Sequence, residues 1–409
     1  MAVPAMGHGA AVRDGDAMAI DRVLRGRVEP GGEVRDVQVG RGLIVGIVPP
    51  ADPSATALTG EQACIVSEAF FDLQVNGFAG VDFNRAGLTG EELSRTTHAM
   101  WAHGIARFLP TVITASVATM VGVLATIRRA REEAPVLARA IPGIHLEGPF
   151  VCPQDGPRGA HPRVHVCDPD WDMFCRLQDA AGGLIRLVTL APERPGALGL
   201  IGQLRGAGVV VAIGHTDAAE SDIDAAVRAG AQLSTHLGNG AHAVLPRHRN
   251  YIQKQLATDG LLASIIVDGH HLTEYFVKNV VRCKGPERVI LVTDAMAAAA
   301  APPGIYRLGE VLAEAQSDGA VRLPGTPYLA GSALTMDRAV NNVRHFAGIP
   351  LGHALGMATR HPRQLWPDSP GGLTPGAPAD IVLLRDGERL EVLETIVAGE
   401  TVYRARDIS

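Results

Sequence analysis

The stretch Ile144-His145-Leu146-Glu147-Gly148-Pro149-Phe150 decides how the rest of the chain is interpreted. It completes an apolar run that starts at Ile141 and stops at a carboxylate, which is typical of a buried strand whose carboxyl end opens into a site. Three later runs repeat this pattern and stop at His215, His236 and Asp294. One glutamate, two histidines and one aspartate at four strand ends predict a metal-ligand set with a carboxylate left over to handle protons.

Short apolar runs alternate with helical patterns throughout the centre of the chain. Eight runs predict strands, at residues 69–75, 106–113, 140–146, 185–190, 209–213, 231–235, 262–267 and 289–293. Helical patterns lie between them, for example at residues 91–103, 117–133, 201–207, 218–229 and 274–283. This alternation predicts an α/β fold, a (β/α)8 TIM-type barrel. A doubly wound open sheet is the alternative, and the barrel is favoured because polar residues follow most of the strands, not one switch point.

Both ends of the chain show the alternation of apolar and polar residues that is typical of antiparallel strands. Residues 22–48 and 380–402 carry this pattern, and neither segment has enough strands to be stable alone. We therefore expect a small β-sandwich domain built from residues 21–66 plus 366–409, a barrel domain at 67–365, and a flexible tail at 1–20.

The composition is that of an ordinary globular protein. The 409 residues are 46% hydrophobic, yet no apolar run approaches the roughly 20 residues of a membrane helix. The absence of a hydrophobic signal region near the N-terminus predicts a cytoplasmic protein. Five scattered cysteines predict neither a disulfide framework nor a thiolate zinc site. The net charge of −6 and the 4% aromatic content argue against nucleic acid as a partner.

The residue types at the strand ends suit hydrolysis assisted by a metal ion. We expect Glu147, His215 and His236 to bind one divalent cation, for which carboxylate and neutral imidazole favour Zn²⁺ or Fe²⁺. Any one of these histidines alone would more often be a buried polar residue, but four such positions recur at strand ends. Asp294 is then the general base and later the general acid, the alternative being a helix N-cap. Loop histidines His161 and His271 are candidates to polarise a carbonyl and to hold the substrate.

From residue 70 to 402 the chain resembles the amidohydrolase superfamily, and within it the N-acetylglucosamine-6-phosphate deacetylases. The resemblance rests on residues 145–150, Gly214-His215-Thr216, Thr235-His236-Leu237 with Asn239, Asp268-Gly269 with His271, Thr293-Asp294-Ala295, and residues 329–332 with Met336.

It implies a barrel with a small β-sandwich domain, usually in a homodimer, that hydrolyses the acetamide of an amino-sugar 6-phosphate. It also implies that Glu147, His215 and His236 bind the metal, that Asp294 is the acid/base, and that His161 polarises the carbonyl. The substrate would be contacted by His271, Asn239, Gly240, Arg247 and Ala160.

The first predicted strand distinguishes one metal from two. Many amidohydrolases carry two histidines there, whereas this chain has Gln74 and Asn76, as in the single-metal deacetylases that it resembles. Because neither amide is a good ligand for zinc, we expect one metal ion, with Zn²⁺ first and Fe²⁺ or another divalent ion as alternatives.

The loop after His236 departs from the pattern of the resembling family. Gly238 and Gly240 replace bulkier residues, and Arg247 stands at the distance expected of a phosphate-binding arginine, within this subunit or across a dimer, but in an unusual setting. An alternative substrate is therefore a different, unphosphorylated N-acyl or cyclic amide, for which the two glycines would leave room. A third hypothesis is a barrel that binds a sugar without turning it over.

Overall fold

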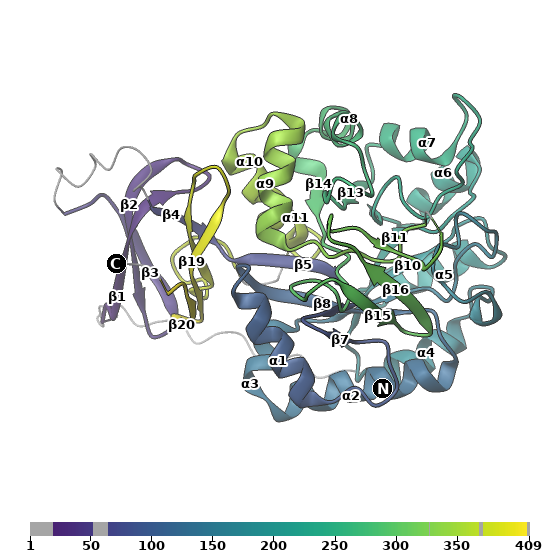
Figure 1. Ribbon diagram of the computed structural model, residues 1–409, viewed down its shortest axis with the longest axis horizontal. Helices are drawn as coiled ribbons and strands as arrows, with labels where there is room; N and C mark the ends of the chain where they lie inside the picture. Colours follow the sequence, from purple (N-terminus) through teal and green to yellow (C-terminus); the bar gives the residue numbers. More distant parts are fainter. Residues whose placement is uncertain (1–18, 52–63, 327, 368–370, 407–409) are drawn as a thin grey trace.

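A computed structural model of the protein describes residues 19–51, 64–326, 328–367 and 371–406. Of the predicted tail at 1–20, only the last two residues are among them. The molecule has two main parts, an α/β barrel and a separate sheet made from the two ends of the chain (Figure 1).

Eight strands pair in parallel to form the barrel. They are β5 (Phe70–Val75), β8 (Ile105–Ile113), β9 (Ile144–Glu147), β10 (Ile185–Leu190), β11 (Val210–Ile213), β12 (Leu233–Ser234), β13 (Leu262–Ile265) and β14 (Val289–Leu291). Each strand pairs with its neighbour in chain order, from β5 to β14. A parallel bridge from Val75 to Ala295 brings the two outer strands together, as does the bond from the Asp294 amide to the Gln74 carbonyl (3.0 Å). The predicted barrel is thereby confirmed, and the open sheet is excluded.

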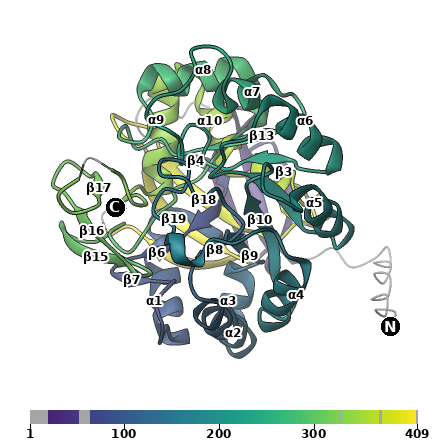
Figure 2. The same ribbon diagram turned by 90° about the vertical axis from the view of Figure 1, so that its right-hand side faces the viewer.

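Helices surround these strands as a ring (Figure 2). They are α1 (Gly90–Trp101), α2 (Val117–Glu133), α3 (Pro135–Ala140), α4 (Trp171–Ala180), α5 (Ala197–Gly206), α6 (Glu220–Ala229), α7 (Tyr251–Ala257), α8 (Glu274–Lys284), α9 (Met336–Ala347), α10 (Leu351–Ala358) and α11 (Arg360–Arg363), with 3-10 turns η2 (Arg163–His165) and η3 (Pro286–Arg288). The third strand was predicted from Ala140 but begins at Ile144, because Pro135 starts a helix that runs to Ala140.

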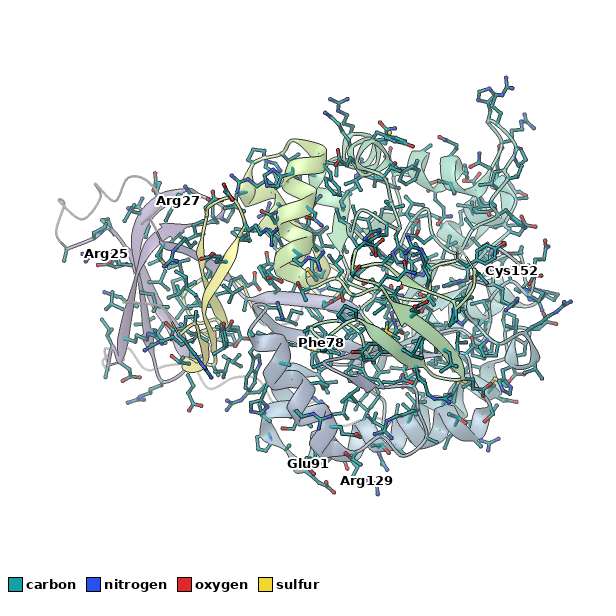
Figure 3. All side chains as sticks on the ribbon, in the orientation of Figure 1. Arg25, Arg27, Phe78, Glu91, Arg129 and Cys152 are labelled. Carbon is teal, nitrogen blue, oxygen red and sulfur yellow. The ribbon has the colours of Figure 1, made fainter. Side chains whose placement is uncertain are left out.

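The two chain ends form one seven-stranded sheet. Its strands are β1 (Arg22–Val28), β2 (Glu33–Gly40), β3 (Leu43–Val48), β4 (Cys64–Glu68), β18 (Ile381–Arg385), β19 (Glu391–Val397) and β20 (Glu400–Arg404), in the order β20-β19-β18-β4-β1-β2-β3. Buried Val37, Ile44, Val66 and Ile381 contribute to its core. In Figure 3, Arg25 and Arg27 on this sheet lie at the opposite end of the molecule from Cys152 on the barrel. The expected β domain from both ends is confirmed, while its limits at 66/67 and 365/366 stay a prediction.

Two small sheets interrupt the barrel pattern. Strands β6 (Gly77–Phe78) and β7 (Val81–Asp82) form a hairpin directly after β5. Strands β15 (Gly304–Leu308), β16 (Val311–Ala315) and β17 (Val321–Arg322) form a three-stranded sheet after β14. Neither small sheet was predicted from the sequence. Within the described residues, no helix has the length and apolar character needed to cross a membrane.

Candidate active site

The predicted strand-end residues meet in one cavity of about 910 Å³. Its lining includes Asn76, Glu147, Ala160, His161, His215, His236, Asn239, Gly240, His271 and Asp294. They come from the ends of β5, β9, β11, β12 and β14 and from the loops that follow, so the parallel barrel brings together residues up to 218 positions apart, as in the bond between Asn76 and Asp294. Every predicted site residue except Arg247 lines this cavity.

Glu147, His215 and His236 converge most closely. The Nε2 atom of His236 lies 3.0 Å from Oε1 of Glu147 and 3.1 Å from Nε2 of His215. Nε2 of His215 lies 3.3 Å from the same carboxylate oxygen. All three side chains are buried, and in the described part of the chain they are the one group of at least three His, Cys, Asp or Glu residues placed to hold a metal ion.

The hydrogen bonds around this group leave the right atoms free for a cation. The Nδ1 atom of His215 donates to the carbonyl of Pro157 (2.8 Å), so its Nε2 carries a lone pair. Burial would raise the pKa of Glu147, but the adjacent side chains of His215 and His236 outweigh it and hold this pKa well below the usual value, so the carboxylate is ionised. Two imidazoles and one ionised carboxylate fit a divalent cation such as Zn²⁺ or Fe²⁺.

The two amides of the first strand bond to carboxylates. Gln74 Nε2 donates to Oε1 of Glu147 (2.9 Å), and Asn76 Nδ2 donates to Oδ1 of Asp294 (2.7 Å). Both side chains present N–H groups, not lone pairs, toward the acidic groups of the site. This geometry supports the expectation of a single metal ion, because an N–H group cannot act as a ligand.

Asp294 lies beside the three predicted ligands and has a perturbed acidity. Burial, followed by the nearby charge of Glu147, raises its pKa to about 6. A carboxyl group with a pKa this close to neutrality can both take up and release a proton during turnover. The alternative of a helix N-cap is not what the structure shows, since no helix starts at residue 295.

His161 is held by Thr114, a residue that was not predicted from the sequence. Its Nδ1 lies 2.7 Å from the hydroxyl of Thr114, and both side chains are buried. Burial, then the neighbouring His215, lowers the pKa of His161 to about 3, so the ring is neutral. Gly148 makes room for this contact, because a Cβ there would lie 2.2 Å from the Thr114 hydroxyl oxygen. Thr114 directly follows Ile113 at the end of β8, so the strand-end rule that found Glu147 could also have found it.

Asp268 orients the ring of His271. Its Oδ2 lies 2.7 Å from Nδ1 of His271, and its Oδ1 accepts the backbone N–H groups of His270 and His271, both at 2.8 Å. Burial would raise the pKa of Asp268, but these bonds outweigh it and lower the pKa to about 2. The ionised Asp268 therefore keeps the proton of His271 on Nδ1 and leaves Nε2 for a ligand.

The glycines after His236 do not enlarge the cavity. A Cβ at Gly240 would lie 2.7 Å from the ring of His215, and one at Gly238 would lie 2.9 Å from the side chain of Leu272. Both glycines also have positive φ angles, of 55° and 99°. The structure therefore overturns the reasoning that they open room for a larger amide: neighbouring side chains already fill the space beside them.

Arg247 lies outside the cavity of its own chain. It is exposed in the loop before α7 and contributes nothing to the lining, whereas Arg158 does line it. Arg158 donates to the carbonyl of His161 (2.7 Å) and forms an ion pair with Asp155. A role for Arg247 at the phosphate stays a prediction that needs the loop of a second subunit.

The β15–β17 sheet covers part of the cavity. Leu308, Glu310, Val311, Leu323 and the exposed Tyr328 of this segment belong to the lining. The sequence did carry a signal for it: two short runs rich in apolar residues, 305–308 and 311–313, flank a turn at Gly309-Glu310.

Comparisons with known proteins agree with this geometry. The Amidohydrolase family model matches residues 65–402. The chain is 30% identical over 362 residues to an N-acetylglucosamine-6-phosphate deacetylase of Bacillus subtilis (88% of this chain, 89% of the relative). It is 32% identical over 358 residues to an N-acetylgalactosamine-6-phosphate deacetylase of Escherichia coli O157:H7 (87% of this chain, 92% of the relative).

A solved structure also matches most of the chain. The N-acetyl-D-glucosamine-6-phosphate deacetylase of Mycobacterium smegmatis superposes with a TM-score of 0.83 at 32% identity, covering 93% of this chain and 100% of that one. The family model spans the barrel and, in the terminal sheet, nearly all of β4, strands β18 and β19 and part of β20. The chain belongs to the amidohydrolase family, and within it to the N-acetylglucosamine-6-phosphate deacetylases.

Proposed function

We propose that this protein hydrolyses the acetamide of N-acetylglucosamine 6-phosphate, giving glucosamine 6-phosphate and acetate. The observation that carries the proposal is the meeting of Glu147, His215 and His236 with Asp294 in one cavity. Relatives that carry this activity in their names are similar over 84–88% of the chain.

The three converging side chains would hold one divalent cation, which supplies Lewis acidity for attack on an amide. Asp294 takes a proton from the attacking water and later gives one to the departing amine. Its pKa near 6 suits both transfers, and the Asn76 amide keeps its carboxylate facing the site.

Neutral His161 would polarise the amide carbonyl through an Nε2–H group. That requires Nδ1 to accept the hydroxyl proton of Thr114, which the 2.7 Å contact allows. His271, held by Asp268, presents Nε2 to the rest of the substrate. Asn239, Gly240 and Ala160 form the wall around the sugar.

We also propose zinc as the first choice of metal, a homodimer in which Arg247 reaches the phosphate of the neighbouring subunit, and a cytoplasmic location. Metal analysis of the purified protein and its mass in solution test the first two. The exposed position of Arg247, outside its own cavity, supports a role across subunits.

Acetate release from four compounds tests the function. N-acetylglucosamine 6-phosphate, its galactosamine epimer and both unphosphorylated sugars are compared with metal-loaded enzyme. The epimer is included because the Escherichia coli relative is named for it. Preference for N-acetylglucosamine 6-phosphate supports the proposal. Equal or higher turnover of the unphosphorylated sugars would contradict it and move the search to other N-acyl compounds.

A further inference from the structure

Asp72 on β5 is a buried acid that the proposed mechanism does not use. It is fully buried at the junction of β5 with the segment after β14, where Val75 and Ala295 form a parallel bridge. It is not among the residues that line the catalytic cavity. Burial raises the pKa of Asp72 to about 7, and the charge of nearby Asp294 adds to this rise, although hydrogen bonds oppose it. A carboxyl group kept in such unfavourable surroundings calls for a physical reason.

Three hydrogen bonds connect Asp72 to both sides of this junction. The hydroxyl of Thr293 donates to Oδ2 (2.6 Å), while the backbone N–H groups of Gln74 (3.1 Å) and Thr293 (3.3 Å) donate to Oδ1. The Thr293 hydroxyl oxygen also accepts the N–H of Ala295 (3.1 Å). Asp72 therefore holds residue 293 directly and residue 295 through a single hydroxyl group, and these two residues flank Asp294.

The other bonds of the Asp294 segment (residues 293–295) either lead back to Asp72 or reach only carbonyl groups. The N–H of Asp294 donates to the carbonyl of Gln74 (3.0 Å), whose own N–H is held by Asp72. Ser332 donates to two carbonyl oxygens of the segment, through its hydroxyl (2.6 Å) and its N–H (3.0 Å). Every N–H of the segment thus depends on Asp72, either directly or through one intermediate group.

We propose that Asp72 is a positioning residue for Asp294: it fixes the backbone of the Asp294 segment and so aims the Asp294 carboxyl group at the predicted metal ligands. Asp294 has a φ of 49°, a left-handed conformation that is unfavourable for an aspartate unless its surroundings hold it. In this orientation Asn76 donates to its Oδ1 (2.7 Å). Because a displacement of about 1 Å can cost about 100-fold in rate, a fixed segment matters for proton transfer. The inference rests on the acid/base role proposed for Asp294.

Asp72→Asn tests the proposal with little change of shape. An amide nitrogen in place of one carboxylate oxygen cannot accept a hydrogen bond, so either the Thr293 hydroxyl or the two backbone N–H groups lose their acceptor. We expect kcat for acetate release to fall about 10- to 100-fold, while KM and metal content stay within about twofold of wild type. Glu394→Gln is the control for loss of a buried acid, because Glu394 accepts a threonine hydroxyl in the terminal sheet and does not line the catalytic cavity. It should lower thermal stability and leave kcat unchanged.

Thr293→Val removes the same bond from the other partner, so the test survives if Asp72→Asn does not fold. It should lower kcat as Asp72→Asn does, and Thr293→Ser, which keeps the hydroxyl, should restore most of the rate. Adding Asp72→Asn to Asp294→Asn should lower kcat less than about twofold further, because a residue that acts through Asp294 has no effect once that carboxyl group is absent. Wild-type kcat in both Asp72→Asn and Thr293→Val, or a full additive loss in the double variant, would overturn the proposal.

A crystal structure of Asp72→Asn tests the positioning without turnover. We expect the Asp294 carboxyl group to move and its bond with Asn76 to be lost. An Asp294 at its wild-type φ with that bond intact would overturn the proposal. Failure of the proposed function gives a different result, namely a wild-type enzyme that releases no acetate.

Discussion

Replacing Thr114 with valine tests how the proton of His161 is placed. Valine has nearly the shape of threonine but lacks the hydroxyl that lies 2.7 Å from Nδ1 of His161. The ring then has no partner at Nδ1, and the neutral tautomer with its proton on Nε2 loses its stabilisation. That tautomer is the one able to donate to the amide carbonyl.

The size of the effect follows from burial. Thr114 and His161 are only 1% and 3% exposed, so an unpaired Nδ1 costs about 1–3 kcal/mol. If this cost falls on the donating tautomer, kcat/KM should decrease about 10- to 100-fold. Acetate release under steady-state conditions measures it. Metal content should not change, because the hydroxyl of Thr114 bonds to His161, which is not one of the three predicted ligands.

Thr114→Ser is the matched control, since it keeps the hydroxyl and should restore most of the activity. A general loss of packing would affect both variants, whereas loss of the hydrogen bond affects only valine. A Thr114→Val enzyme within twofold of the wild-type kcat/KM would refute the reasoning. Equal losses in the valine and serine variants would refute it as well.

Three other predictions concern the acid/base, the metal and the fold. Asp294→Asn should lower kcat by about 10²- to 10⁴-fold, while metal content stays at the wild-type level. A variant with wild-type activity would remove Asp294 from the proposed mechanism. Chelation should abolish acetate release, and added Zn²⁺ should restore it. In Glu147→Gln, added Zn²⁺ should not restore activity, because the ligand set has lost its negative charge. Full activity of the chelated protein would contradict a metal-dependent reaction. Burial lowers the pKa of His361 to about 4, below its value of 6.5 in the unfolded chain. As the pH falls, the unfolded state therefore protonates His361 before the folded state does. Its contribution of about 3 kcal/mol to the free energy of unfolding is complete above pH 6.5 and is lost as the pH falls through 4. His361→Asn, which can keep the bond to the Val289 carbonyl, should show a smaller loss of stability over that range in denaturant titrations.

The strand-end residues were predictable because one physical rule places them. Parallel strands of a barrel expose their carboxyl ends on the same face, so Glu147, His215, His236 and Asp294 had to meet once the eight strands were found. The strands themselves were visible as apolar runs, since nearly all of their residues are buried. For β10 and α2 even the predicted bounds agree with the structure, because turn or capping residues flank both elements.

Other features of the site lie beyond a pattern of residue types. The bond from Gln74 to Glu147 depends on the direction of an amide across the barrel, which no local spacing encodes. The position of Arg247 depends on how a glycine-rich loop turns away from its own cavity. From the sequence alone, Gly238 and Gly240 suggest open space beside the site. In the structure, the backbone at these glycines lies directly against Leu272 and His215.

The backbone conformation at the site gives evidence for its proposed catalytic role that does not depend on side-chain chemistry. His215, His236 and Asp294 all have positive φ angles, of 50°, 30° and 49°, in the left-handed region that β-carbons disfavour. Each such residue costs about 1–3 kcal/mol, and glycine would avoid most of that cost. A role for these side chains in the site gives a physical reason for histidine and aspartate, and not glycine, at these three turns. The turns follow β11, β12 and β14 and direct the three side chains into the cavity that Glu147 enters from β9. Of the seven non-glycine residues with positive φ among the described residues, these three are therefore the ones that the proposed chemistry requires.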